Sequence, residues 1–275
     1  MKLERIVVTN DDGIGAPGLA VAERLAGMLA DEVWVFAPAT DQSGMAQALS
    51  MHHPLRVHEH GGRRYSVTGT PADCVMVALG AGLMGGARPG LVLSGVNWGH
   101  NLSDSVMYSG TVGAAVAAAH FGLPAIALSQ AFTDCRAFDF SVAETWARPV
   151  IEALWAARDP EDDPHGNAWN INFPMRDPAT VAGLRFTRQV GGSMIAPRLV
   201  EQRDSRGQAY RWMAFERGLE RVDHADSDVV ALRDGYVSAM PLKRERCDEA
   251  RLAAIGVGRE WALAPDVSTA ARKSR

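Results

Sequence analysis

Lysine is scarce in this chain of 275 residues: it occurs only as Lys2, Lys243 and Lys273. None of the three stands in a GxxxxGK[ST] pattern, which excludes a P-loop nucleotide-binding protein. Positive charge therefore comes almost entirely from arginine. With a formal net charge of -4 and a pI near 6.1, the chain also lacks the basic field that proteins use to bind a nucleic-acid polymer. No DNA or RNA partner is expected.

Cysteine is also scarce, and long apolar runs are missing. The three cysteines, Cys74, Cys135 and Cys247, are odd in number and far apart, which favours neither a disulfide framework nor a zinc knuckle and is typical of free thiols in a reducing compartment. No stretch approaches 18 apolar residues, and no signal-peptide core follows Met1. No GxSxG elbow for a serine nucleophile is present. We expect a cytoplasmic protein without a membrane partner, and 47% hydrophobic residues suffice for one large core.

What the sequence does contain is a regular alternation of short apolar strands and helices. Pro71, preceded by the capping residue Thr70 and followed by Asp73, marks one helix start clearly. The alternation predicts an α/β fold with an open, mostly parallel sheet flanked by helices on both faces. The expected strands are 5–9, 33–37, 91–94, 125–128 and 169–173, and the expected helices are 17–29, 71–79, 111–120 and 141–157.

The pattern changes after Pro174. Strands are expected at 184–190 and 210–215, flanking a polar, arginine-rich connection that suits an extension or an oligomer contact better than a core. The segment 159–164 has the composition of a solvated loop, and the tail 268–275 is small, polar and basic. We therefore expect a single domain over 1–275, with an α/β core at 1–180, an arm and oligomerisation segments at 181–245, and a helix and tail at 246–275.

Oxygen-bearing side chains follow three successive strands, at the edge where open parallel sheets bind ligands. Asp11 and Asp12 follow the first strand, Ser43 the second, and Asn97 the third. Adjacent carboxylates repel each other unless a cation lies between them, and a ligand set made only of oxygen suits Mg²⁺ or Mn²⁺. Taken alone, however, an Asp-Asp-Gly sequence is more often a turn or a helix cap than a metal site.

A second group of polar residues, Tyr108 to Thr111, precedes the alanine-rich helix. The free N–H groups at a helix N-terminus favour a phosphate, to which Ser109 and Thr111 could also donate, although either residue could equally be an ordinary N-cap. His100 lies near the same loops and has either an acid–base or a peripheral role. Two other motifs are interpreted as structure: 58–60 as a surface strand or hairpin, and the GxGxxG match at 80–85 as a turn, because it follows a helix.

In order along the chain, these segments resemble the SurE family of survival-protein nucleotidases. The resemblance rests on TNDDGI at 9–14, AP at 37–38 with QSG at 42–44, GTPADCV at 69–75, SGVNWGHNL at 94–102, YSGTV at 108–112 and DGYVS at 234–238. Ser105 departs from the pattern, because an acidic residue often follows the position of Asp104 in that family.

The resemblance implies a Rossmann-like core with a C-terminal β-hairpin arm, assembled as a homodimer or homotetramer. It implies metal-dependent hydrolysis of nucleoside 5′- and 3′-monophosphates, with an exopolyphosphatase activity as a further expectation. One divalent cation per subunit, Mg²⁺ or Mn²⁺, is expected. Asp11, Asp12, Ser43 and Asn97 match its ligands, and Asp11 and Asp12 are the expected catalytic residues. The substrate and its phosphate are expected at Asn10, Ser43, Asn101, Ser109, Gly110 and Thr111.

Two mechanisms and two other functions remain open at this level. A metal-bound water or one of the two aspartates could attack phosphorus. The alternative function is a non-catalytic module that binds a nucleotide or phosphate for regulation. An NAD-dependent oxidoreductase is disfavoured because Asp11-Asp12-Gly13 stands where a glycine-rich phosphate turn is needed.

Overall fold

The computed structural model describes residues 2–132, 139–158, 168–245, 247–255 and 257. The chain divides into two compact units, Met1–Arg244 and Glu245–Arg275. In the second unit the described residues include helix α6 (Glu249–Ile255). The sheets, the remaining helices and the candidate site all belong to the first unit. The expected loop at 159–164 and tail at 268–275 lie outside the described residues.

A nine-stranded sheet forms the centre of the first unit, in the order β3-β4-β2-β1-β5-β6-β7-β11-β8. Its strands from β4 to β7 run parallel, and β3 and β11 pair antiparallel with their neighbours β4 and β7. The expected α/β class with a mostly parallel sheet is therefore confirmed. The strands are β1 (Leu3–Thr9), β2 (Ala30–Pro38), β3 (Val57–Gly61), β4 (Arg64–Val67), β5 (Leu91–Trp98), β6 (Ala125–Gln130), β7 (Ala168–Phe173), β8 (Leu184–Phe186) and β11 (Val237–Leu242).

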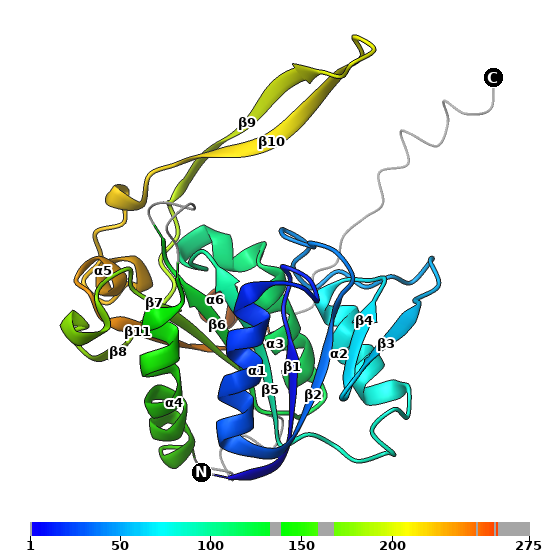
Figure 1. Ribbon diagram of the computed structural model, residues 1–275. Helices are drawn as coiled ribbons and strands as arrows, with labels where there is room; N and C mark the ends of the chain where they lie inside the picture. Colours follow the sequence, from blue (N-terminus) through cyan, green and yellow to red (C-terminus); the bar gives the residue numbers. More distant parts are fainter. Residues whose placement is uncertain (1, 133–138, 159–167, 246, 256, 258–275) are drawn as a thin grey trace. The chain divides into compact units, whose positions relative to one another are not determined.

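Helices cover both faces of this sheet (Figure 1). One core packs around α1 and α4 and includes Leu25 and Ile151, whereas a second core packs around α2 and α3 and includes Cys74 and Ala115. Burial of each apolar face against the sheet is the main stabilisation that such layers have. The helices are α1 (Pro17–Leu29), α2 (Pro71–Gly80), α3 (Gly110–His120), α4 (Ser141–Ala156) and α5 (Asp228–Arg233), with short 3₁₀ helices at Ser103–Met107, Pro178–Thr180 and Leu219–Arg221.

The strand order reverses direction at β1. The chain moves from β1 outward to β2 and β4, and then returns to the other side of β1 to form β5. Such a reversal leaves an open crevice beyond the carboxyl ends of the two strands, which is where α/β proteins bind ligands. Asp11 follows β1 and Asn97 lies one residue before the end of β5, so the fold brings the predicted ligands to this crevice.

The C-terminal part differs from the expectation in two respects. The arginine-rich connection is itself a strand: β9 (Met194–Arg203) pairs antiparallel with β10 (Ala209–Arg217) in a separate two-stranded sheet, here called the arm. The segment expected as strand 184–190 instead contributes the three-residue β8 to the main sheet, beside β11. Figure 1 shows the arm extending away from the main sheet.

Local signals in the sequence predicted the helix starts well. Thr70 and Asp73 form a reciprocal capping box at α2, in which each side chain accepts a hydrogen bond from the other residue's backbone N–H. The segment 58–60 lies on the exposed edge strand β3, as expected. Within the described residues, no helix has the length and apolar character needed to cross a membrane.

Candidate functional site

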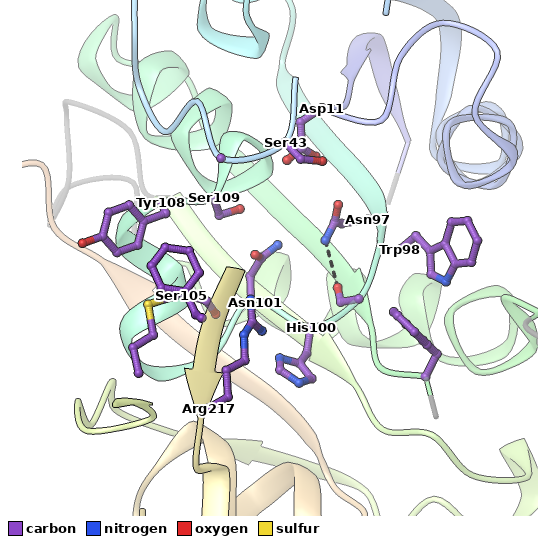
Figure 2. Close-up of a pocket in the computed structure, with 15 residues that line it drawn as sticks. Asp11, Ser43, Asn97, Trp98, His100, Asn101, Ser105, Tyr108, Ser109 and Arg217 are labelled. Carbon is purple, nitrogen blue, oxygen red and sulfur yellow. Dashed lines mark hydrogen bonds between the residues drawn. The ribbon is translucent and has the colours of Figure 1, made fainter. Parts of the chain in front are cut away.

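A cavity of about 370 Å³ opens beyond the carboxyl ends of β1 and β5. Its size falls in the range of roughly 300–1,000 Å³ that small-molecule sites occupy. Five of the predicted site residues line it: Asp11, Ser43, Asn97, Asn101 and Ser109. Figure 2 shows Asp11 and Ser43 together at one end, with Asn101 between them and Arg217. The remaining lining residues are Gly44, Trp98, Gly99, His100, Ser105, Tyr108, Phe132, Met194, Phe215 and Arg217.

Asp11 is held in a fixed position at this end of the cavity. Its carboxylate is almost fully buried and accepts a hydrogen bond from the hydroxyl of Thr111, while its backbone carbonyl accepts one from the N–H of Gln42 at 2.8 Å. Gly110 allows the start of α3 to approach, because a Cβ on this residue would lie 2.9 Å from the Cβ of Asp11. A side chain at position 110 would therefore displace the turn that contains Asp11 and Asp12, here called the acidic turn.

The two adjacent carboxylates resist ionisation in this setting. Burial raises the pKa of Asp11, an effect that the hydrogen bond from Thr111 partly offsets. Burial, and then the charge of Asp11, raise the pKa of Asp12 to about 7, although the backbone N–H of Trp98 donates to Asp12 at 3.4 Å. A bound cation would remove this cost by compensating both charges. The electrostatics of the acidic turn therefore fit a metal site better than an ordinary surface turn.

Neutral oxygen atoms complete the possible ligand set. Ser43 is exposed at the cavity, where its backbone N–H donates to Asp41 at 2.7 Å. The side-chain N–H of Asn97 donates to the carbonyl of Gly99 at 2.9 Å, which fixes the amide so that its oxygen remains available. Among the described residues, no group of three or more His, Cys, Asp or Glu side chains could hold a metal. A cation here would depend on two carboxylates and neutral oxygens, the donors that Mg²⁺ and Mn²⁺ prefer.

The start of α3 forms the next part of the site. Ser109 lines the cavity and is also the N-cap, since its hydroxyl oxygen accepts from the N–H of Val112 at 3.1 Å. Thr111, by contrast, is fully buried and its hydroxyl is engaged with Asp11. The cap interpretation is therefore confirmed for Ser109 and does not exclude a phosphate at the same place. Thr111 supports the acidic turn.

Four of the predicted site residues are not part of the cavity lining: Asn10, Asp12, Gly110 and Thr111. Asn10 is fully buried, and its side-chain N–H donates to the carbonyl of Gly13 at 3.0 Å, which closes the acidic turn. Its side-chain oxygen has no hydrogen-bond partner within the described residues. Asn10 thus shapes the turn that presents the two aspartates.

Asn101 is held by three buried polar residues that the sequence analysis did not identify. Its backbone N–H donates to the side chain of Asn172 at 2.7 Å, and its carbonyl accepts from Asn170 at 2.8 Å and from Asn172 at 3.1 Å. Its side-chain N–H donates to Ser129 at 2.9 Å. The signal that could have found them is two asparagines spaced by two in a strand that is otherwise apolar, because alternate residues share one face.

Residues from the arm also line the cavity, and the sequence analysis missed them as well. Met194 of β9, and Phe215 and Arg217 of β10, all line it. His100 lies beside Arg217 in Figure 2, and its pKa is lowered by burial and then by the positive charge of Arg217. Both effects favour the neutral imidazole over the charged form.

Comparison with known proteins gives a consistent result. The model of the family described as "Survival protein SurE" matches residues 6–195. The protein named 5'-nucleotidase SurE 1 of Burkholderia lata is 49% identical over 92% of this chain and 95% of its own length. The proteins named 5'-nucleotidase SurE of Bradyrhizobium diazoefficiens and Brucella suis are 42% and 46% identical, over 92% and 86% of this chain and 98% and 91% of their own lengths. The crystal structure of the SurE protein from Aquifex aeolicus superposes with a TM-score of 0.75 at 29% identity, covering 91% of this chain and 98% of that one.

Proposed function

This chain belongs to the survival protein SurE family, and on that premise we propose that it is a nucleotidase that hydrolyses nucleoside monophosphates with the help of a divalent cation. The observation that carries the proposal is that Asp11, Asn97 and Ser109 line one cavity, so that oxygen donors suited to a cation adjoin a helix N-terminus. Hydrolysis of a phosphate monoester needs both the cation and the helix N-terminus, because negative charge builds up on the phosphate oxygens during the reaction.

The cation is proposed to be held by Asp11, Asp12, Ser43 and Asn97. The raised pKa values of the two aspartates support this assignment, since both carboxylates ionise more readily beside a positive charge. When bound, Mg²⁺ or Mn²⁺ would polarise a phosphoryl oxygen and lower the pKa of a coordinated water. One cation per subunit is proposed.

The protein's own groups are proposed to orient the phosphate. The hydroxyl of Ser109 and the N–H groups that begin α3 donate to its oxygens, and the amide of Asn101 contacts it from the other side. Asn170, Asn172 and Ser129 keep Asn101 in place through the hydrogen bonds described above. Holding these donors in advance lowers the barrier, because no reorganisation is needed as charge develops.

Assembly into a dimer or tetramer is proposed through the arm. Four large side chains on β9 and β10 are well exposed, at 61% for Leu199, 42% for Tyr210, 65% for Trp212 and 69% for Met213. Leu199 and Met213 are paired on one face of the arm and Tyr210 and Trp212 lie on the other, so both faces carry exposed apolar side chains of the kind found in protein interfaces.

Phosphate release from AMP tests the proposal directly. Protein stripped with EDTA should release phosphate only after Mg²⁺ or Mn²⁺ is added, and Asp11→Asn should reduce the rate by about a hundredfold or more, as loss of a cation ligand does. Asp31→Asn is the matched control, because Asp31 is an exposed aspartate that pairs with Lys2, outside the cavity lining. Binding of AMP without phosphate release under any metal would instead support a regulatory binding module.

A further inference from the structure

The cavity has an apolar wall built from two separate parts of the chain. Tyr108 precedes the phosphate-side residue Ser109, while Met194 begins β9 and Phe215 lies near the end of β10. The rings of Tyr108 and Phe215 lie with their centroids 6.2 Å apart and their planes 29° from parallel. The two rings are stacked on each other and, with Met194, form an aromatic and apolar part of the cavity lining.

This wall contributes little to the protein core. Tyr108 is 53% exposed, Phe215 and Met194 are only half-buried, and none of the three belongs to a core cluster among the described residues. Aromatic rings that remain exposed in a cavity can still bury their faces against a bound ligand. A planar ligand ring would stack on them.

The wall is nevertheless fixed in position. Asp104 lies four residues before Tyr108, and its carboxylate accepts from the backbone N–H groups of Gly192 and Met194, each at 2.9 Å. These hydrogen bonds lower the pKa of Asp104, so the carboxylate remains charged and the bonds are strong at neutral pH. The beginning of the arm is thereby attached to the segment that carries Tyr108.

The other aromatic pair in the cavity is less suited to a flat ring. Trp98 and Phe132 have planes 56° apart, so they present no common face. Trp98 also directly follows the proposed cation ligand Asn97 and donates its backbone N–H to Asp12. Figure 2 shows Trp98 and Tyr108 on opposite sides of the cavity, with Asn97 on the side of Trp98 and Ser109 on the side of Tyr108.

The far end of the cavity supplies a hydrogen-bonding group for the remainder of such a ligand. Arg217 is the only cationic side chain among the described residues that line the cavity, and it lies at the opposite end from Asp11 (Figure 2). Its guanidinium carries several N–H donors, which suit the oxygen and nitrogen acceptors of a sugar or a nucleobase. The cavity therefore extends from the phosphate end at Ser109, past the aromatic wall, to the hydrogen-bond donor Arg217.

We infer that Tyr108, Met194, Phe215 and Arg217 form the nucleoside-binding part of the site, in which the base stacks on the Tyr108–Phe215 wall and Arg217 donates to acceptors of the nucleoside. The inference rests on the proposed function for the identity of the phosphate end. It assigns the arm a role in substrate binding in addition to assembly, because three of the four residues belong to β9 and β10. The ligand class is a phosphate monoester that carries an aromatic base.

The test compares AMP with ribose 5-phosphate, which has the same ester and sugar but no base. Phe215→Ala should raise the KM for AMP about tenfold, the effect typical of losing one base–aromatic stack, and leave the KM for ribose 5-phosphate within about twofold. Phe215→Leu keeps an apolar side chain in the same place and should show the same selective loss, which secures the result if the alanine variant is unstable. Phe186→Ala is the matched control, because Phe186 is an exposed aromatic residue on β8 that lies outside both the cavity lining and the arm.

The outcomes separate this inference from the proposed function. Equal rises in KM for both substrates, or no change for AMP, would overturn the nucleoside wall while the wild-type enzyme still releases phosphate. If the wild type hydrolyses neither compound, the proposed function fails, and calorimetric dissociation constants for the same two compounds decide the inference instead. In that assay a selective loss of AMP affinity in Phe215→Ala supports the wall, and an equal or absent loss refutes it.

Discussion

Asn172 holds the backbone of Asn101 from both sides: its side-chain oxygen accepts from the N–H of Asn101 at 2.7 Å, and its side-chain N–H donates to the carbonyl of Asn101 at 3.1 Å. Both residues are buried, and Asn101 lines the cavity whereas Asn172 does not. One side chain on β7 therefore fixes the orientation of a residue that we propose contacts the substrate.

Asn172→Ala should lower the kcat/KM for AMP by about ten- to a hundredfold, because a small displacement of a positioned donor is enough to cost that much. It should also lower the free energy of unfolding by about 1–3 kcal/mol, since the buried backbone N–H of Asn101 loses its partner and its carbonyl loses one of two donors. Asn170→Ala is the matched comparison, because it removes only one hydrogen bond to Asn101. Phosphate-release kinetics and urea unfolding measure both effects, and equal kinetic losses in the two variants would contradict the positioning role.

Asp11→Asn should weaken the response of the melting temperature to metal without lowering the melting temperature of the metal-free protein. In EDTA near pH 8 the variant should melt at a temperature equal to or above that of the wild type, because it removes a buried carboxylate whose pKa is raised. Mg²⁺ or Mn²⁺ should raise the melting temperature of the wild type by mass action and that of the variant much less. Differential scanning fluorimetry across a metal titration measures this. An equal metal-induced shift in both proteins would show that Asp11 is not a ligand.

Thr111→Val should change the metal requirement, since the hydroxyl of Thr111 donates to Asp11 and is fully buried. The concentration of Mn²⁺ for half-maximal activity should rise several-fold, as for loss of a group that orients a ligand. Inhibition by inorganic phosphate should change little. Ser109→Ala is the converse variant, because Ser109 lines the cavity, and it should weaken phosphate inhibition while sparing the metal requirement. The opposite pattern would assign the phosphate contact to Thr111.

Asp228 should make the stability of the protein depend on pH. Its side chain is fully buried and accepts from the N–H of Ser103 at 2.8 Å, and burial raises its pKa to about 6. A raised pKa in the folded state means that the native protein binds this proton more tightly than the unfolded chain. The stabilisation is thus complete below about pH 4 and is lost as the pH rises through about 6, with a total of about 3 kcal/mol.

Urea unfolding of the wild type and Asp228→Asn isolates this effect, because all other titrating groups are shared. The difference in unfolding free energy between the wild type and the variant should fall by up to about 3 kcal/mol between about pH 4 and pH 7. A constant difference across this range would show that Asp228 does not titrate within it.

Shortening the arm should reduce the size of the assembly. Pro197 pairs with Phe215, so replacing residues 198–214 with a two-residue Asn-Gly turn keeps this pair and the cavity residues while removing the exposed apolar side chains further along the arm. Light scattering should report an oligomer for the wild type and a smaller species for the variant. An unchanged mass would assign assembly to another surface.

Much of the core was predictable because it depends on local signals. The helix from Pro17 to Leu29 has a proline at its first position, and the acidic turn directly follows an apolar strand, so both positions could be read from the sequence. Grouping Asp11 with Asn97 required only the rule that parallel strands end at one edge. These features need few contacts between distant parts of the chain.

The remainder depended on contacts that no local pattern encodes. The segment β9 forms a strand because β10 pairs with it, and its mostly exposed side chains do not alternate between apolar and polar as those of a half-buried strand do. The engagement of Thr111 with Asp11 joins residues 100 positions apart, so the sequence offered only its place at a helix start. The approach of Phe215 to Tyr108 is equally distant in sequence.

The two ends of the cavity are anchored in parts of the protein that differ in their opening free energy. The acidic turn continues β1, a buried strand with hydrogen-bonded neighbours on both sides, whose amides exchange with solvent only when the main sheet opens. The arm is a two-stranded sheet with mostly exposed residues, whose amides exchange through local opening. Hydrogen exchange at the phosphate end therefore follows global unfolding, whereas exchange at the arm follows local fluctuations and responds separately to temperature, denaturant and assembly.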